Sequence, residues 1–133
     1  MTTGKIALIT GSNGGLGQAL VDRFLAEGYF VFAGVKDLSM DTVTRPNCMT
    51  VQLDITSDAD IEHCHREIAK VGQLTVLVNN AGVSGWGSFW KRELADEQAI
   101  FDVNLWGTVR MIRSFWEDLE ANHGLIVNIG SIS

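Results

Sequence analysis

Short apolar runs alternate along this chain with longer stretches in which apolar residues recur at helical spacing. The run at residues 5–10 is rich in apolar and β-branched side chains, which is typical of a buried parallel strand. Similar runs predict four further strands, at residues 30–35, 49–53, 74–78 and 125–129.

The amphipathic stretches between these runs predict the helices. Apolar residues between Leu16 and Leu25 repeat at helical spacing, and Gly28 can cap that helix at its C-terminus. Ser57 predicts the N-cap of a helix over 58–70, and a long helix is expected over 96–121. We expect the buried stripe of the long helix to hold Phe101, Leu105, Val109, Ile112, Leu119 and either Phe115 or Trp116.

This order of elements predicts a doubly wound parallel sheet, an α/β fold with strand order 3-2-1-4-5. The polar residues 36–47, with at most a short helical turn, and the glycine-rich residues 81–89 would be loops. A nucleotide would lie across the carboxyl edge of the sheet, at the switch point between the first and fourth strands. We expect one domain over residues 1–133.

A glycine-rich segment stands at that edge. Residues 10–17 read Thr-Gly-Ser-Asn-Gly-Gly-Leu-Gly and lie between the first predicted strand and the first predicted helix. Glycines there let backbone N–H groups approach a pyrophosphate, and the helix N-terminus favours its negative charge. A tight turn can use glycine without binding anything, but this context favours a dinucleotide site.

Composition narrows the classes of function. Hydrophobic residues make up 46% and charged residues 20%, as in a folded protein, and the net charge of −6 argues against a nucleic-acid partner. The first apolar run is too short for a signal peptide or a membrane span, so we expect a cytoplasmic protein with no membrane partner. Cys48 and Cys64 lack metal spacing, which is typical of a reducing compartment. His63 and His65 would point in different directions on a helix, which favours a solvated face over a metal site.

Further polar residues follow the predicted strands. Asp54 follows the third strand, Asn-Asn-Ala-Gly at 79–82 follows the fourth, Asn104 lies within the long helix and Ser131 follows the fifth strand. Together with the Thr-Gly-x-x-x-Gly-x-Gly spacing of residues 10–17, these features resemble the short-chain dehydrogenase/reductase family, classical type. The resemblance covers essentially all of the chain. It implies a Rossmann-type fold and an oxidoreductase that transfers hydride between NAD(P)(H) and a small carbonyl compound or secondary alcohol.

The resemblance assigns cofactor contacts to particular residues. The pyrophosphate and the adenosine ribose would be held by Gly11, Ser12, Asn13, Gly15, Leu16 and Gly17. The adenine would contact Asp54 and the backbone of Ile55. The floor beside the adenosine and ribose would be shaped by Asn80, Ala81 and Gly82. Taken without the resemblance, Asn79 and Asn80 could equally form a polar turn.

The resemblance also assigns two catalytic roles. Asn104 would anchor a water in a proton relay, whereas the alternative is a locally bonded or solvent-facing helix residue. Ser131 would orient and polarise the substrate oxygen by hydrogen bonding, although short polar residues after strands often begin turns. Ser133 is expected to point elsewhere.

The choice of cofactor depends on the end of the second strand. An acid there selects NAD by accepting the ribose 2′-hydroxyl, whereas a basic residue accommodates the 2′-phosphate of NADP. Counting from the glycines reaches Asp37, which favours NAD. Matching to the family places Val35 in the acidic position with Lys36 directly after it, which favours NADP(H). Lys36 as an ordinary solvated lysine stays open.

The catalytic Tyr-x-x-x-Lys pair of the family, expected beyond Ser131, does not occur in this sequence. The single tyrosine is Tyr29, at the start of the second strand, and Ala33 stands four residues later. Strands six and seven of the family fold are missing too. We therefore expect little or no activity from these residues alone, and the alternative function is a noncatalytic dinucleotide-binding module or truncated relative.

Two questions about partners stay open at this point. Residues 83–90 supply one wall of the expected substrate site, and its Trp86, Phe89 and Trp90 could contact an apolar substrate or serve packing. Relatives commonly pair through the long helix and the helix after it, so a homo-oligomer is possible.

Overall fold

The computed structural model describes residues 4–40 and 44–131, and these form one parallel sheet between helices. The strand order β3-β2-β1-β4-β5 confirms the predicted 3-2-1-4-5 arrangement. The strands are β1 (Ile6–Ile9), β2 (Phe30–Val35), β3 (Cys48–Gln52), β4 (Val76–Asn79) and β5 (Leu125–Asn128). Every neighbouring pair is parallel. β1 is central: β2 and β3 lie on one side of it, and β4 and β5 lie on the other. The switch point expected for nucleotide binding therefore lies between β1 and β4.

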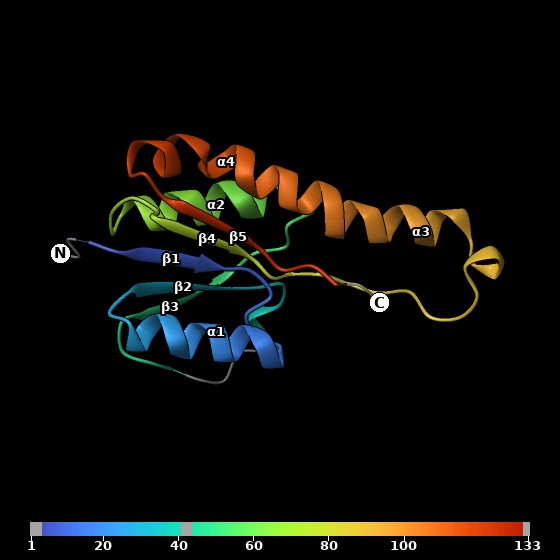
Figure 1. The fold of residues 1–133 in the computed structure, drawn as a ribbon, viewed down its shortest axis with the longest axis horizontal. Coiled ribbons are helices and arrows are strands. Elements are labelled where there is room, and N and C mark those ends of the chain that lie inside the picture. The colour runs from blue at the N-terminus through green and yellow to red at the C-terminus, as the bar shows by residue number, and fades with distance from the viewer. Residues whose placement is uncertain (1–3, 41–43, 132–133) are drawn as a thin grey trace.

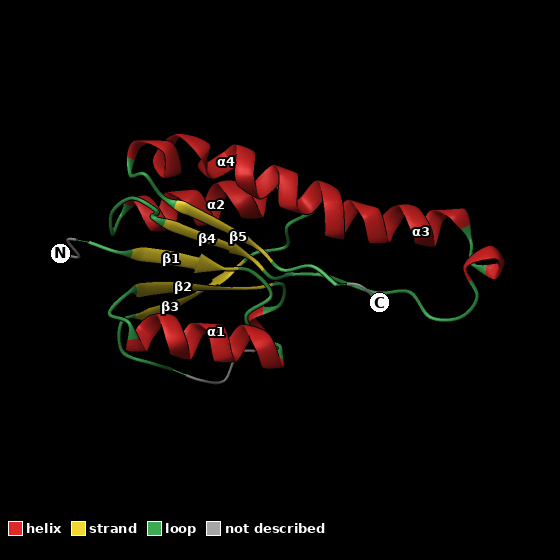
Figure 2. Ribbon diagram, viewed as in Figure 1, coloured by secondary structure: helices red, strands yellow, loops and turns green. Residues whose placement is uncertain are grey.

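Helices cover both faces of the sheet (Figures 1 and 2). α1 (Gly15–Ala26) covers one face, and α2 (Asp58–Ala69) and α4 (Thr108–Ala121) cover the other. Successive side chains of β1 point to opposite faces of the sheet. Ala7 and Ile9 pack towards Val21 of α1, whereas Ile6 and Leu8 pack towards α2 and α4. A strand buried on both faces has to be apolar throughout, which explains the continuous run in the sequence.

The bounds of β2 match the prediction, and those of the other strands differ from it by one or two residues at an end. β4 begins at Val76 rather than at residue 74. The preceding Thr75 bonds to Ile6 through its side chain as well as through its backbone N–H. The Thr75 hydroxyl accepts the N–H of Ile6 at 3.1 Å and donates to the carbonyl of the same residue at 2.9 Å.

The long helix is not continuous α-helix, and part of its predicted buried stripe is wrong. α3 (Leu94–Phe101) and α4 are joined by a π-helical segment, Asp102–Gly107. A π turn adds residues to the helical repeat and rotates the faces on either side of it. Phe101 and Leu105, which we expected to be buried, are 54% and 47% exposed, and no residue of α3 is buried on any face. Met111, which the pattern missed, is fully buried.

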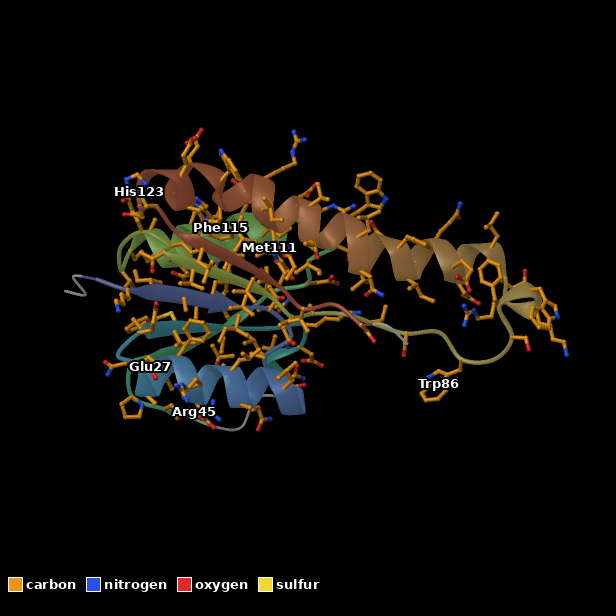
Figure 3. All side chains as sticks on the ribbon, in the orientation of Figure 1. Glu27, Arg45, Trp86, Met111, Phe115 and His123 are labelled. Atoms are coloured by element: carbon orange, nitrogen blue, oxygen red, sulfur yellow. The ribbon has the colours of Figure 1, made fainter. Side chains whose placement is uncertain are left out.

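A projecting arm carries exposed aromatic side chains. The arm comprises the loop after β4, a short 3₁₀ turn at Phe89–Lys91 and α3, and it extends away from the sheet (Figure 1). Trp86 is 89% exposed and stands clear of the other side chains (Figure 3). Within the described residues, no helix combines the length and the apolar character that a membrane crossing requires.

The choice left open between Phe115 and Trp116 leads to a stability prediction. Phe115 is fully buried and its ring stacks on His65 with centroids 4.9 Å apart, whereas Trp116 is 50% exposed. Phe115→Ala should lower the free energy of unfolding by about 3–5 kcal/mol. Trp116→Ala should change it by no more than roughly 0.5 kcal/mol. Urea denaturation of both variants measures the difference, and equal losses would contradict this placement of the core.

Candidate functional site

The glycine loop is pressed between two backbone segments, which explains two of its glycines. Gly11 has φ +59°, and a Cβ on it would meet the Cα of Ala81 at 2.8 Å. A Cβ on Gly17 would meet the Cα of Ser12 at 2.7 Å and the carbonyl oxygen of Gly11. Because backbone atoms cannot move aside, glycine at 11 and 17 lets the loop, α1 and the segment after β4 meet.

The N-terminus of α1 faces this loop without a competing cap. Gly14 is the N-cap residue, and no side chain among the described residues caps the helix there. The first turn is uncharged, reading Gly-Leu-Gly-Gln from Gly15. The free N–H groups and the positive end of the helix dipole therefore favour an anion at this position.

A cavity of about 410 Å³ opens beside the loop and brings together most of the predicted cofactor residues. Those lining it are Gly11, Asn13, Gly15, Leu16, Gly17, Lys36, Asp54, Ile55, Asn80, Ala81 and Gly82. The lining also includes three residues that the sequence analysis did not assign, Gly14, Leu53 and Val103, and it includes Val83, the first residue of the expected substrate wall at 83–90. Ser12, Asn104 and Ser131 lie outside the lining.

Polar contacts inside the fold tie the loops around the cavity together. Ser12 is buried, and its hydroxyl donates to the carbonyl of Gly34 at 3.0 Å. Thr10, which the sequence reasoning did not single out, accepts the backbone N–H groups of Asn80 at 3.0 Å and Ala81 at 2.9 Å. The Asn80 amide in turn donates to the carbonyl of Gly11 at 3.1 Å. A buried hydroxyl at the end of β1 was the signal that could have found Thr10, since such a group requires a partner.

The end of β2 presents a lysine to the cavity and turns the neighbouring acid away. Lys36 lines the cavity and is exposed. The Asp37 carboxylate accepts hydrogen bonds from the backbone N–H of Ser39 at 3.0 Å and from its hydroxyl at 2.8 Å. These bonds lower the pKa of Asp37 and hold its carboxylate in a local turn.

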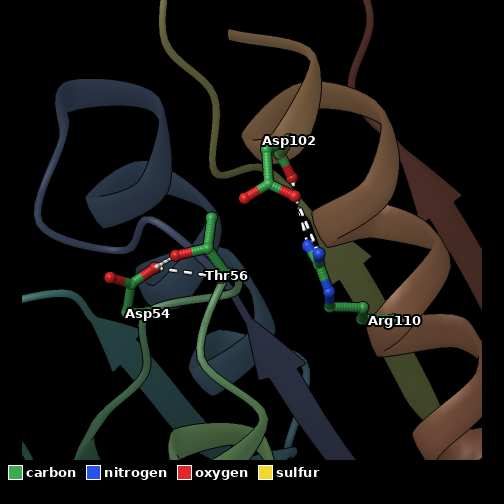
Figure 4. A network of polar contacts seen from close by, with 4 residues as sticks. All are labelled: Asp54, Thr56, Asp102 and Arg110. Carbon is green, nitrogen blue, oxygen red and sulfur yellow. Dashed lines mark hydrogen bonds and ion pairs between the residues drawn. The ribbon is translucent and has the colours of Figure 1, made fainter. Parts of the chain in front are cut away.

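Asp54 is held by the residues that follow it (Figure 4). One oxygen of its carboxylate accepts the N–H of Thr56 at 2.9 Å and the hydroxyl of Thr56 at 2.7 Å. Partial burial acts to raise the pKa of Asp54, but these hydrogen bonds and the charge of Lys36 outweigh it and lower the pKa below its ordinary value. Asp54 is thus kept as an anion, and Lys36 lies close enough to interact electrostatically with its carboxylate.

Asn104 projects from the π-helical segment and hydrogen-bonds to the loop after β4. Its Oδ1 accepts the N–H of Val83 at 2.8 Å, and its Nδ2 donates to the carbonyl of Val83 at 2.7 Å. A primary amide has two donor hydrogens and two acceptor lone pairs, so one of each remains available to a water molecule. Val83 itself lines the cavity.

The remaining predicted residues lie at the periphery. Ser131 is exposed beyond β5, whose pairing with β4 is continued by the N–H of Ile129 donating to the carbonyl of Asn79 at 3.0 Å. Phe89 and Trp90 are 68% and 80% exposed and lie outside the cavity lining, as does Trp86. Ser133 falls outside the described residues.

The histidines of α2 pair with carboxylates. Nε2 of His63 lies 3.9 Å from Glu67, and Nε2 of His65 lies 3.5 Å from Asp118 of α4. Across residues 4–40 and 44–131 there is no group of three or more His, Cys, Asp or Glu side chains that could hold a metal ion.

The family model described as short chain dehydrogenase matches residues 5–133 of the sequence. The chain belongs to the short-chain dehydrogenase family. This confirms the family that the glycine spacing, Asp54, Asn104 and Ser131 indicated.

Individual relatives within the family are moderately similar. The NADPH-dependent 1-acyldihydroxyacetone phosphate reductase of Schizosaccharomyces pombe is 35% identical over 99% of this chain and 46% of its own length. The mitochondrial D-beta-hydroxybutyrate dehydrogenase of Mus musculus is 32% identical over 98% of this chain and 42% of its own. The chain therefore spans a little under half the length of these curated relatives.

A solved structure supports the fold assignment directly. The short-chain dehydrogenase of Burkholderia cenocepacia, crystallised in complex with NADP, superimposes with a TM-score of 0.84 at 32% identity. The match covers 97% of this chain and 54% of that one. The described sheet and helices therefore have the arrangement of a short-chain dehydrogenase.

The tight contact at Gly17 makes a prediction within this family fold. Gly17→Ala should lower the free energy of unfolding by roughly 1–3 kcal/mol, because the added methyl group meets backbone atoms. Gly15→Ala is the control, since none of the described atoms lies within 4 Å of its added Cβ. Thermal unfolding of both variants checks this. A Gly17→Ala protein as stable as the Gly15→Ala protein would mean that the loop can open without cost.

Proposed function

We propose that this chain binds NADP(H) and serves hydride transfer between that cofactor and a small carbonyl compound or secondary alcohol. The observation that carries the proposal is the uncapped N-terminus of α1 facing the same cavity as Lys36. The first group favours a pyrophosphate, and the second supplies a positive charge to the ribose end of a dinucleotide.

The preference for NADP(H) over NAD(H) follows from the end of β2. A 2′-phosphate requires a cation nearby, and Lys36 lines the cavity while Asp37 is engaged by Ser39. Val35, in the position where an acid would select NAD, is apolar and buried. Two relatives point the same way, since one is named NADPH-dependent and another was crystallised with NADP.

The site residues would then divide the work of binding and orientation. Backbone N–H groups from Gly14 to Gly17 would bind the pyrophosphate, and Asp54 with the Ile55 backbone would contact the adenine. When bound, a nicotinamide dinucleotide supplies or accepts the hydride. Ser131 would hydrogen-bond the substrate oxygen. The remaining donor and acceptor of the Asn104 amide would hold a water for proton transfer.

The alternative proposal is a binding module without activity of its own. It is favoured by the position of Tyr29, the single tyrosine of the sequence. Tyr29 precedes β2 at the opposite end of the sheet from the cavity, with its ring edge-on to Phe24 at 4.9 Å. That ring cannot donate a proton at the carboxyl edge. The cytoplasmic location and the homo-oligomer expected from the sequence remain predictions.

The cofactor proposal predicts the effect of removing one charge. Lys36→Ala should weaken NADPH binding about 10- to 100-fold, the loss expected for a hydrogen bond to a charged group, and leave NADH binding unchanged. Asp37→Asn is the matched control and should alter neither affinity by more than about twofold, because its side chain already serves Ser39. Quenching of tryptophan fluorescence during titration measures the affinities of the unaltered chain and of both variants for NADPH and NADH. Tighter binding of NADH than NADPH would overturn the cofactor preference.

The absence of a suitably placed tyrosine predicts a separation of binding from turnover. The purified 133-residue chain should bind NADPH yet reduce ketones poorly or not at all, since general acid catalysis typically contributes about 10²–10⁴-fold. Loss of NADPH absorbance with a series of small ketones checks this. Turnover proportional to chain concentration would show that another group donates the proton.

A further inference from the structure

The π-helical segment between α3 and α4 is bridged by a single arginine. Arg110 lies in the first turn of α4, and Asp102 is the first residue of the π-helical segment. Nη2 of Arg110 donates to a carboxylate oxygen of Asp102 at 2.7 Å, and Nη1 donates to the backbone carbonyl of the same residue at 3.3 Å. The guanidinium therefore connects the first turn of α4 to the start of the π segment (Figure 4).

Arg110 also borders a groove in which two other charged side chains pair with each other. It lines a groove of about 570 Å³ between α2 and α4, together with Glu62 and Arg66. Those two side chains pair with each other at 3.3 Å on α2. Among the described carboxylates, the one that forms an ion pair with Arg110 is Asp102.

The bridged segment is also the part of the helix that carries Asn104. Asn104 reaches Val83 through two hydrogen bonds, at 2.8 and 2.7 Å. At the other end of the segment Gly107 packs so tightly that a Cβ on it would meet the Cγ1 of Ile55 at 2.6 Å. The direction of Asn104 therefore depends on the shape of six residues held at both ends.

A π turn is costly to maintain without such restraints. π-Helical hydrogen bonding is rare and usually confined to single turns, so the same residues can relax towards an ordinary α-helix. Relaxation would rotate Asn104 relative to Gly107, because the two repeats differ in residues per turn. The hydrogen bond from Nη1 of Arg110 to the carbonyl of Asp102, the first residue of the segment, opposes that change.

We propose that Arg110 is a positioning residue: by bridging Asp102 it holds the π segment in the shape that aims Asn104 at Val83. The structural part of this inference stands on the contacts alone, and its consequence for proton transfer rests on the proposed function. Arg110 and Asp102 are about 32% and 43% exposed, so their ion pair adds little to global stability. The ion pair acts instead on the local shape of the π segment.

The test uses the 133-residue chain and an NMR signal at Val83, a residue that Arg110 does not touch. In Arg110→Ala the backbone N–H of Val83, which donates to Asn104, should exchange with solvent about tenfold faster. The side-chain NH₂ signals of Asn104 should move towards those of a free amide. Arg113→Ala is the matched control, because within the described residues Arg113 lies on the same helix and has no ion-pair partner.

A conservative variant separates geometry from charge. Arg110→Lys keeps the charge but lacks the planar fork that reaches both oxygens, so it should restore the Val83 signal only in part. An unchanged Val83 exchange rate in both Arg110 variants, or an equal effect of Arg113→Ala, would overturn the proposal. Because the readout requires no cofactor, it is independent of whether the chain binds NADPH. If Arg110→Ala fails to fold, Arg110→Lys alone decides the outcome by the same signal.

Discussion

The close approach of backbone at Gly11 and Gly17 is the constraint on which the site depends. With no side chain at either position, α1 begins directly behind β1 and its first N–H groups open onto the cavity. The same approach brings the segment after β4 against the loop, where Thr10 and Asn80 bond across it. A methyl group at Gly17 would separate these parts, so the anion-binding geometry and the loop packing share one cause.

The sheet and the cavity lining could be predicted because both follow from local patterns. Strands buried on two faces are continuously apolar, and parallel strands place the residues after them at one edge. Gly15, Lys36 and Asp54 could therefore be assigned to the same edge before the fold was known, and all three line the cavity. Thr10 escaped this reasoning, because its role depends on N–H groups seventy residues away in the sequence.

Features that depend on tertiary contacts could not be predicted. Phe101 and Leu105 fit the apolar pattern of a buried stripe, but α3 extends away from the sheet and buries none of its residues. Asp37 was left as a competing cofactor ligand, since the sequence does not reveal that Ser39 engages it. The bridge between Asp102 and Arg110 joins residues eight apart, outside the spacing at which ordinary helix pairs form. In the last two cases a polar side chain has a partner that the periodicity of the sequence does not reveal.

The central claim is that the carboxyl edge of this sheet binds NADP(H) through the N-terminus of α1 and Lys36. Titration of the ¹⁵N-labelled chain with NADP⁺ tests it most directly, because each backbone amide reports its own surroundings. The amide signals of Gly14, Gly15 and Lys36 should shift together and saturate at one affinity. Shifts confined to the groove between α2 and α4, or no saturable shift at all, would contradict it.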